Sequence, residues 1–201
     1  MRGLPRGGCD TRAMSAPPEV PAVVAKAFDV SRRRGYVSFC RNETGRLLAA
    51  LAATRSGTMA EFGTGCGVGT AWLRSGVRDD TRIVSAEVDP DLAGAAAEIF
   101  ADDDRVEVVA ADSSTLSDRG PFSLLFLDSR EPDASGPDTV VDLVEPGGMV
   151  VLDDFVPCAS WPPVDGGRVD VLRERWLTDE RFTTAEILVA PDTAALIATR
   201  R

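Results

Sequence analysis

Short apolar runs alternate with amphipathic segments along most of the chain. Seven of these runs are predicted strands, at residues 58–62, 82–87, 105–110, 122–128, 149–153, 182–189 and 194–199. Several are apolar at consecutive positions, as in residues 124–127 and 150–152. Such strands are typical of a parallel sheet whose two faces are both covered by helices, because neither face then meets water.

The segments between the strands contain turn residues or have the spacing of amphipathic helices. The predicted helices are residues 18–31, 42–54, 68–75, 91–101, 137–143 and 167–178. Asn42 and Asp89 stand at the start of two of them as candidate N-caps, because their side chains can accept bonds from free N–H groups of the first turn. The alternation of strands and helices predicts one doubly wound α/β domain over residues 19–201.

The two ends of the chain depart from this alternation. Only residues 190–193 separate the last two predicted strands, and a parallel connection needs a dozen or more residues, so these strands must be antiparallel. Residues 1–18 are rich in Gly, Pro and Arg and lack apolar periodicity, which predicts a flexible leader. Within this leader, Met14 is a second candidate start.

Composition excludes several classes of chemistry. The chain has 201 residues and no histidine, which excludes Ser-His-Asp triads, metalloprotease helices and imidazole bases. With 22 Lys and Arg against 32 Asp and Glu, the net charge of −10 argues against nucleic-acid and membrane partners, which need clustered positive charge. No apolar run approaches the roughly 20 residues that span a bilayer. The four cysteines form no CxxC pair, which favours reduced thiols in a cytoplasmic protein.

The most informative segment lies between the first predicted strand and the helix after it. Glu61, Gly63, Gly65 and Gly67 form the pattern ExGxGxG, and the GxGxxG spacing of dinucleotide-binding loops is not met. Glycines allow the backbone to turn sharply and to approach a ligand, and the following helix offers free N–H groups. The segment resembles motif I of the class I S-adenosylmethionine-dependent methyltransferases. An ordinary glycine-rich turn is the alternative.

This resemblance implies a site for S-adenosylmethionine (SAM). In that family the glycine loop accommodates the methionine part of the cofactor, and here that loop contains Gly63, Thr64, Gly65 and Gly67. The acidic residue at the start of the motif helps to hold the amino-acid end of the cofactor, a role that the resemblance gives to Glu61.

The second and third strands supply further candidate contacts. Glu87 ends the second strand 20 residues after Gly67, where a carboxylate can accept both hydrogen bonds of a ribose diol, and Val88 follows it. Asp112 and Ser113 follow the third strand, where this family contacts the adenine ring. Asp112 is equally well placed to cap a following helix.

Three carboxylates follow the fourth and fifth strands: Asp128, Asp153 and Asp154. These strands are neighbours in an open α/β sheet, so we expect the carboxylates to converge beside the cofactor crevice, where their oxygens suit Mg²⁺. The arrangement resembles the catechol and caffeoyl-coenzyme A O-methyltransferases, whose metal is held by an Asp after strand four and an Asp-Asn pair after strand five. Here Asp154 replaces that Asn. Alternatively, no metal binds and the carboxylates are caps and edge residues.

The catalytic lysine of those enzymes is missing. It stands three residues after the first Asp, a position that Glu131 occupies in this chain. Either Glu131 takes the proton of the acceptor, or a metal acidifies the hydroxyl enough for water to take it. Asp128 and Glu131 are therefore the candidate catalytic residues, and Asp128 is also a candidate cofactor contact.

The resemblance implies a Rossmann-like class I methyltransferase fold. This fold is a mostly parallel seven-stranded sheet of order 3-2-1-4-5-7-6, with an antiparallel C-terminal strand and helices on both faces. The implied activity is methyl transfer from SAM to a hydroxyl of a small molecule, assisted by Mg²⁺, and the implied assembly includes a homodimer as one option. A metal-independent methyltransferase of the same fold, a nicotinamide oxidoreductase and a catalytically silent cofactor-binding protein are the alternatives. Trp161, after the fifth strand, is a candidate for the substrate rim or for ordinary packing.

Overall fold

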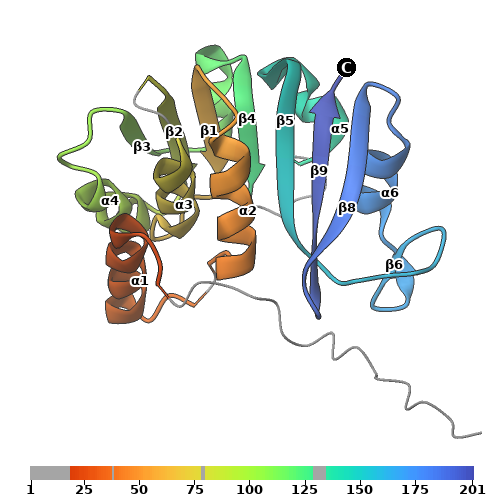
Figure 1. Ribbon diagram of the computed structural model, residues 1–201, viewed down its shortest axis with the longest axis horizontal. Helices are drawn as coiled ribbons and strands as arrows, with labels where there is room; N and C mark the ends of the chain where they lie inside the picture. Colours follow the sequence, from red (N-terminus) through yellow and green to blue (C-terminus); the bar gives the residue numbers. More distant parts are fainter. Residues whose placement is uncertain (1–18, 38, 78–79, 129–134) are drawn as a thin grey trace, which may run out of the picture.

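A mostly parallel sheet of seven strands lies at the centre of the computed structural model, with helices on both faces (Figure 1). The structure describes residues 19–37, 39–77, 80–128 and 135–201. The strand order is β3-β2-β1-β4-β5-β9-β8, and because β8 and β9 are the sixth and seventh strands of this sheet in the chain, it confirms the predicted order. β9 runs antiparallel to both of its neighbours, and its pairing with β8 confirms the orientation predicted from the short link between them.

The predicted alternation of strands and helices is confirmed. The strands of the sheet are β1 (Thr58–Phe62), β2 (Arg82–Glu87), β3 (Val106–Ala110), β4 (Phe122–Leu127), β5 (Val144–Phe155), β8 (Phe182–Ala190) and β9 (Thr193–Arg200). The helices are α1 (Ala22–Arg34), α2 (Asn42–Ala52), α3 (Val68–Gly76), α4 (Pro90–Ile99), η1 (Ser113–Arg119), α5 (Pro137–Val140), η2 (Val141–Leu143) and α6 (Val171–Thr178). Within the described ranges, none of them combines the length and the apolar character that a membrane crossing requires.

The predicted boundaries of α1, β5 and α6 are wrong. The helix predicted over residues 18–31 extends from Ala22 to Arg34, because Pro21 is extended and Gly35 ends the helix in a left-handed conformation. β5 begins at Val144 instead of residue 149, because Val144 pairs with Phe122 of β4 ahead of an irregularity in the ladder. The helix predicted from residue 167 begins only at Val171, because β6 (Val164–Asp165) and β7 (Arg168–Val169) form a small hairpin before it. Gly166 and Gly167 make its two-residue turn with φ of 55° and 78°, which glycine adopts without strain.

Of the two predicted N-caps, one is confirmed. The Asp89 side chain accepts hydrogen bonds from the backbone N–H groups of Asp91 (2.9 Å) and Leu92 (3.3 Å) at the start of α4. Asn42 is instead the first residue of α2, which begins without a side-chain cap.

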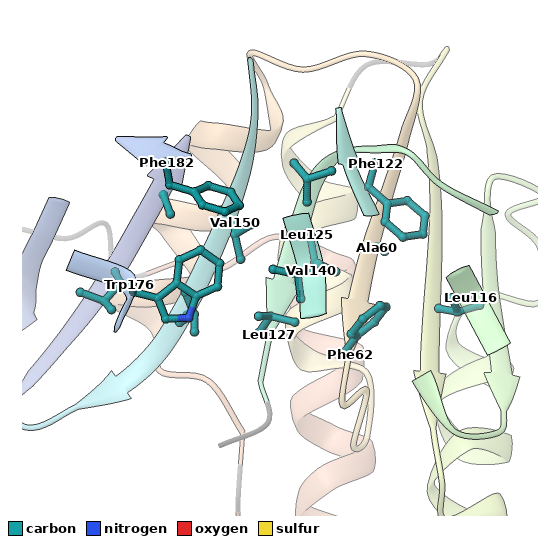
Figure 2. Close-up of a cluster of buried hydrophobic side chains, with 14 of the residues drawn as sticks. Ala60, Phe62, Leu116, Phe122, Leu125, Leu127, Val140, Val150, Trp176 and Phe182 are labelled. Carbon is teal, nitrogen blue, oxygen red and sulfur yellow. The ribbon is translucent and has the colours of Figure 1, made fainter. Parts of the chain in front are cut away.

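Hydrophobic cores on the two faces hold the helices against the sheet. α1, α2, α3 and α4 cover one face, where Leu48, Trp72 and Phe126 are buried. η1, α5 and α6 cover the other face, where the rings of Trp176 and Phe182 pack edge to face with centroids 5.0 Å apart (Figure 2). Burying each such side chain stabilises the fold by about 1.5–3 kcal/mol. Successive residues of β4 from Leu124 to Leu127 enter opposite cores, which explains why this run is apolar at consecutive positions.

Close packing of α2 on α3 positions the N-terminal helices. A Cβ added at Gly45 would lie 2.2 Å from the ring of Trp72, and one added at Gly76 would lie 2.0 Å from the carbonyl oxygen of Ala49. Side chains at these two positions would therefore force the helices apart. The short segment between α1 and α2 is thereby held near the carboxyl ends of the parallel strands, at the lower edge of the sheet in Figure 1.

Candidate active site

The glycine loop connects the end of β1 to α3. The backbone N–H groups of Gly63 and Thr64 donate to the carbonyl oxygen of Ala86, at 3.0 and 3.2 Å, so the loop is tied to β2. Gly67, the N-cap of α3, has φ of 84°, a left-handed conformation that favours glycine. The ExGxGxG pattern therefore forms the strand-loop-helix turn that the sequence predicts, and the first turn of α3 starts beside it.

Glu87 lies across the loop at the end of β2. Its Oε2 accepts a hydrogen bond from the N–H of Gly65 (2.8 Å), and its Oε1 accepts one from the N–H of Asp89 (3.0 Å). These two bonds fix the orientation of a half-buried carboxylate, and each oxygen keeps capacity for another hydrogen bond. The position is compatible with the predicted contact to a ribose diol, which stays a prediction, as does a contact of the exposed Val88.

Glu61 lies inside the fold, beneath the loop. The carboxylate is fully buried, and its Oε2 accepts hydrogen bonds from the hydroxyls of Thr70 on α3 and Ser85 on β2, the latter at 3.0 Å. Burial raises the pKa of Glu61 to about 7. Its Oε1 has no hydrogen-bond partner in the described part of the chain and lies 2.0 Å from where a Cβ at Gly69 would stand. A direct contact of Glu61 with the cofactor stays a prediction.

A chain of hydrogen bonds extends from this carboxylate to the loop. Ser85, which binds Glu61, also shares a 2.5 Å hydrogen bond with the hydroxyl of Thr64. The loop, β1, β2 and α3 are therefore joined through one buried polar network. Sequence analysis missed Ser85 and Thr70, although a serine inside the apolar run 83–86 was the available signal.

Asp112 follows β3 and caps η1. Its Oδ1 accepts a hydrogen bond from the backbone N–H of Ser114 (2.9 Å). Hydrogen bonding by the side chain and then the backbone of Ser114 holds the pKa of the exposed Asp112 below its usual range. The cap interpretation is thus confirmed. The adenine contact proposed for Asp112 and Ser113 stays a prediction.

The segment before α2 also reaches this edge of the sheet, which sequence analysis did not foresee. A Cβ at Gly65 would lie 2.7 Å from the hydroxyl oxygen of Tyr36, so Tyr36 packs against the glycine loop. The Cys40 thiol is buried nearby. Burial raises the pKa of Cys40 well above its ordinary value, and the negative charge of Asp128 adds to this effect.

The three carboxylates after β4 and β5 stand at one edge of the sheet, because these strands are parallel neighbours. The charges of Asp153 and Asp154, like that of Asp128, add to the raised pKa of Cys40. Asp153 is 5% exposed, and its Oδ1 accepts a hydrogen bond from the hydroxyl of Thr44 on α2 (2.9 Å). Asp154 is exposed and has φ of 70°, at the point where the pairing of β5 with β9 shifts register.

Comparison with known proteins identifies this arrangement. A family model described as a methyltransferase domain matches residues 60–155, which include the glycine loop and both strand ends with the carboxylates. A relative from Mycobacterium ulcerans, named as an O-methyltransferase, is 31% identical over 157 residues, which cover 70% of this chain and 69% of the relative. The chain belongs to the class I SAM-dependent O-methyltransferase family.

Other members of the family extend this comparison. An O-methyltransferase relative from Mycobacterium avium is 31% identical over 119 residues, and the chain spans about half the length of that relative, 53%. The solved structure of the O-methyltransferase TomG from Streptomyces achromogenes, in complex with SAM, has a TM-score of 0.72 at 24% identity. That match covers 91% of this chain and 92% of TomG, and it shows that the two share a fold.

The predicted magnesium site of this O-methyltransferase chain does not fit its donor geometry. Among the described residues, no group of three or more His, Cys, Asp or Glu side chains could hold a metal ion. The hydroxyl of Thr44 binds Oδ1 of Asp153, and Asp154 lines a cavity together with residues of the β6–β7 hairpin and the start of α6. The carboxylates follow two neighbouring parallel strands at one edge of the sheet, but they do not form a group that could hold a metal ion. Glu131, the candidate base, lies outside the described residues.

The tryptophans divide between core and surface. Trp72 and Trp176 are buried, as expected for core residues, and the Trp176 indole N–H donates to the carbonyl oxygen of Ser135 (2.8 Å). Trp161 is 64% exposed, which excludes ordinary core packing and leaves the rim as its predicted place.

Proposed function

We propose that this chain transfers a methyl group from SAM to a hydroxyl of a small molecule. The observation that carries the proposal is the pairing of the glycine loop with Glu87, whose carboxylate is held by the N–H of Gly65 at the carboxyl edge of β1 and β2. Membership of the O-methyltransferase family supports it. The absence of GxGxxG spacing argues against a nicotinamide site.

Each part of the crevice has a task in this proposal. Glu87 would accept hydrogen bonds from the ribose, and the N–H groups at the start of α3 would face the carboxylate of the methionine end. When bound, SAM supplies a methyl group that needs no further activation. The chain then has to hold the acceptor oxygen in line with that group and let the hydroxyl proton leave, which is largely a matter of orientation.

The proposed mechanism contains no step that depends on a metal ion. Among the described residues, Asp128, Asp153 and Asp154 do not form a group that could hold a metal ion, so the described geometry predicts methyl transfer that persists in excess EDTA on an identified acceptor. Loss of turnover on chelation, restored by Mg²⁺, would show that Asp128, Asp153 and Asp154 rearrange around a metal. That result would re-establish the metal-assisted mechanism.

Calorimetry with S-adenosylhomocysteine (SAH), the product form of the cofactor, tests the proposal. Glu87→Ala should weaken SAH binding by about 1.5–3 kcal/mol, or roughly 10- to 150-fold, because the ribose hydroxyls lose a charged acceptor. Glu87→Gln, which keeps the shape of the side chain, separates this loss from loosening of the loop. Glu98→Ala removes an exposed carboxylate from α4 and is the matched control.

The outcomes of this experiment are distinct. Weaker SAH binding in both Glu87 variants, with unchanged binding in Glu98→Ala, supports the ribose contact. An unchanged dissociation constant in Glu87→Ala would refute it. A thermal shift with NAD or NADP but none with SAH would refute the methyltransferase proposal as a whole, since a ligand at about 100 times its dissociation constant adds roughly 2.7 kcal/mol of stability.

A further inference from the structure

The side chain of Tyr36, just after the end of α1, lies against the glycine loop. A Cβ added at Gly65 would lie 2.7 Å from the hydroxyl oxygen of Tyr36 and 2.9 and 3.0 Å from Cε1 and Cζ of its ring. These atoms belong to the hydroxyl end of the ring, so it is this end that contacts Gly65. Any side chain at position 65 would displace the half-buried Tyr36, which is the one tyrosine of the sequence.

Packing and hydrogen bonds hold Tyr36 in this position. Gly35 ends α1 in a left-handed conformation with φ of 66°, and the N–H of Tyr36 donates to the carbonyl oxygen of Ser31 (3.0 Å), which closes the helix end. α1 is itself fastened to α4, because Nζ of Lys26 donates to the carbonyl oxygen of Ile99 (2.7 Å). The phenol is therefore held against the loop by a packed helix.

A second residue of α1 lies against the next position of the loop. Ser31 is fully buried, and so is Cys66. Burial raises the pKa of the Cys66 thiol, and hydrogen bonding with Ser31 acts against this rise. Gly65 and Cys66 therefore both lie against the end of α1, which forms a wall beside the glycine loop.

Gly65 lies between the two points that would hold the cofactor. Its N–H donates to Oε2 of Glu87 (2.8 Å), the carboxylate proposed to bind the ribose. Two residues further along the chain, Gly67 is the N-cap of α3, whose first N–H groups would face the methionine carboxylate. The sulfonium of SAM joins the ribose to the methionine chain. A cofactor held at these two points would therefore have its sulfur next to Gly65, where the hydroxyl end of Tyr36 lies.

The charge on the sulfur changes in the proposed reaction, because SAM carries a positive sulfonium and SAH an uncharged thioether. A phenol oxygen accepts weak C–H···O contacts, and an aromatic ring attracts cations, so both groups of a tyrosine favour the sulfonium form. We infer that Tyr36 contacts the cofactor at its sulfur and favours SAM over SAH. The inference rests on the proposed methyl transfer and adds a residue that distinguishes the substrate form of the cofactor from the product form.

The test uses Tyr36→Phe, which keeps the ring on Gly65 and removes only the oxygen. Calorimetry measures the binding of SAM and SAH in separate titrations without an acceptor, so that no methyl group is transferred. The variant should bind SAM about three- to tenfold more weakly, the loss of one or two weak contacts, and SAH within about twofold of wild type. Thr178→Val removes a hydroxyl from the end of α6, on the other face of the sheet, and is the matched control that should change neither affinity.

A second measurement reports on the contact directly. Because Tyr36 is the one tyrosine of the sequence, incorporation of 3-fluorotyrosine gives a single fluorine NMR resonance, which SAM should shift more than SAH does. Equal weakening of SAM and SAH in Tyr36→Phe would indicate a merely structural role and would overturn the inference. Unchanged affinities in this variant, or a resonance that SAM does not shift, would overturn it as well. Wild type that binds neither ligand would instead refute the proposed function, so the two failures are distinguishable.

Discussion

Replacing Glu61 by glutamine should remove a pH dependence of stability that the buried carboxylate creates. Glu61 lies beneath the glycine loop, fully buried, with Oε2 bound by Thr70 and Ser85. Burial raises its pKa from 4.5 to about 7, more than these hydrogen bonds lower it. Glu61→Gln keeps the size of the side chain and an acceptor oxygen for Thr70, but it cannot ionise.

The sign and size of the effect follow from proton linkage. Between pH 4.5 and pH 7 the folded protein holds a proton on Glu61 that the unfolded chain has released, so stability falls as pH rises. The contribution is fully present below pH 4.5 and is lost as pH rises through about 7. Because one pKa unit is worth 1.36 kcal/mol, this shift lowers the free energy of unfolding by about 3 kcal/mol as the pH rises through that range. In Glu61→Gln this loss should be absent.

Urea unfolding at pH 5, 6, 7 and 8, without cofactor, measures the effect. The free energy of unfolding of Glu61→Gln relative to wild type should rise by up to about 3 kcal/mol across this series. The unpaired amide N–H of the variant adds a cost that does not depend on pH, so the slope is the readout and not the absolute stability. Glu180→Gln, at an exposed position before β8, should follow the wild-type slope. Parallel profiles for Glu61→Gln and wild type would refute the assigned ionisation.

Three further changes test the packing of the fold. Asp89→Ala should lower the free energy of unfolding by about 1 kcal/mol in a urea titration, because α4 loses its N-cap. An unchanged free energy of unfolding would show that this cap does not stabilise the protein. Gly69→Ala should destabilise by about 1–3 kcal/mol, since its Cβ would lie 2.0 Å from Glu61 Oε1, and a melting temperature equal to wild type would contradict that clash. Trp176→Phe removes a buried hydrogen-bond donor to Ser135 and should cost about 1–3 kcal/mol in the same assay, whereas a neutral result would mean that this bond contributes nothing.

The sequence by itself determined the alternation of strands and helices and the place of the glycine loop, and its family resemblance implied the order of the sheet. Buried parallel strands are mostly apolar and are bounded by turn residues, so β1 (Thr58–Phe62) and β2 (Arg82–Glu87) could be located to the residue. The glycines at 63, 65 and 67 encode a sharp turn locally, because few other residues adopt the positive φ that the loop requires. The carboxylate at the end of β2, Glu87, could then be found by its place in the chain, 20 residues after Gly67.

What only the tertiary structure decided concerns contacts between residues far apart in the chain. Local pattern cannot show that Ser85 and Thr70 enclose Glu61, or that Thr44 binds Asp153, 109 residues away. Which polar groups become buried depends on which elements meet, and the pKa of a carboxylate depends on that burial. The convergence of acidic residues at one edge was predictable from topology, but the direction of each side chain was not, because neighbouring helices fix it through packing and hydrogen bonds.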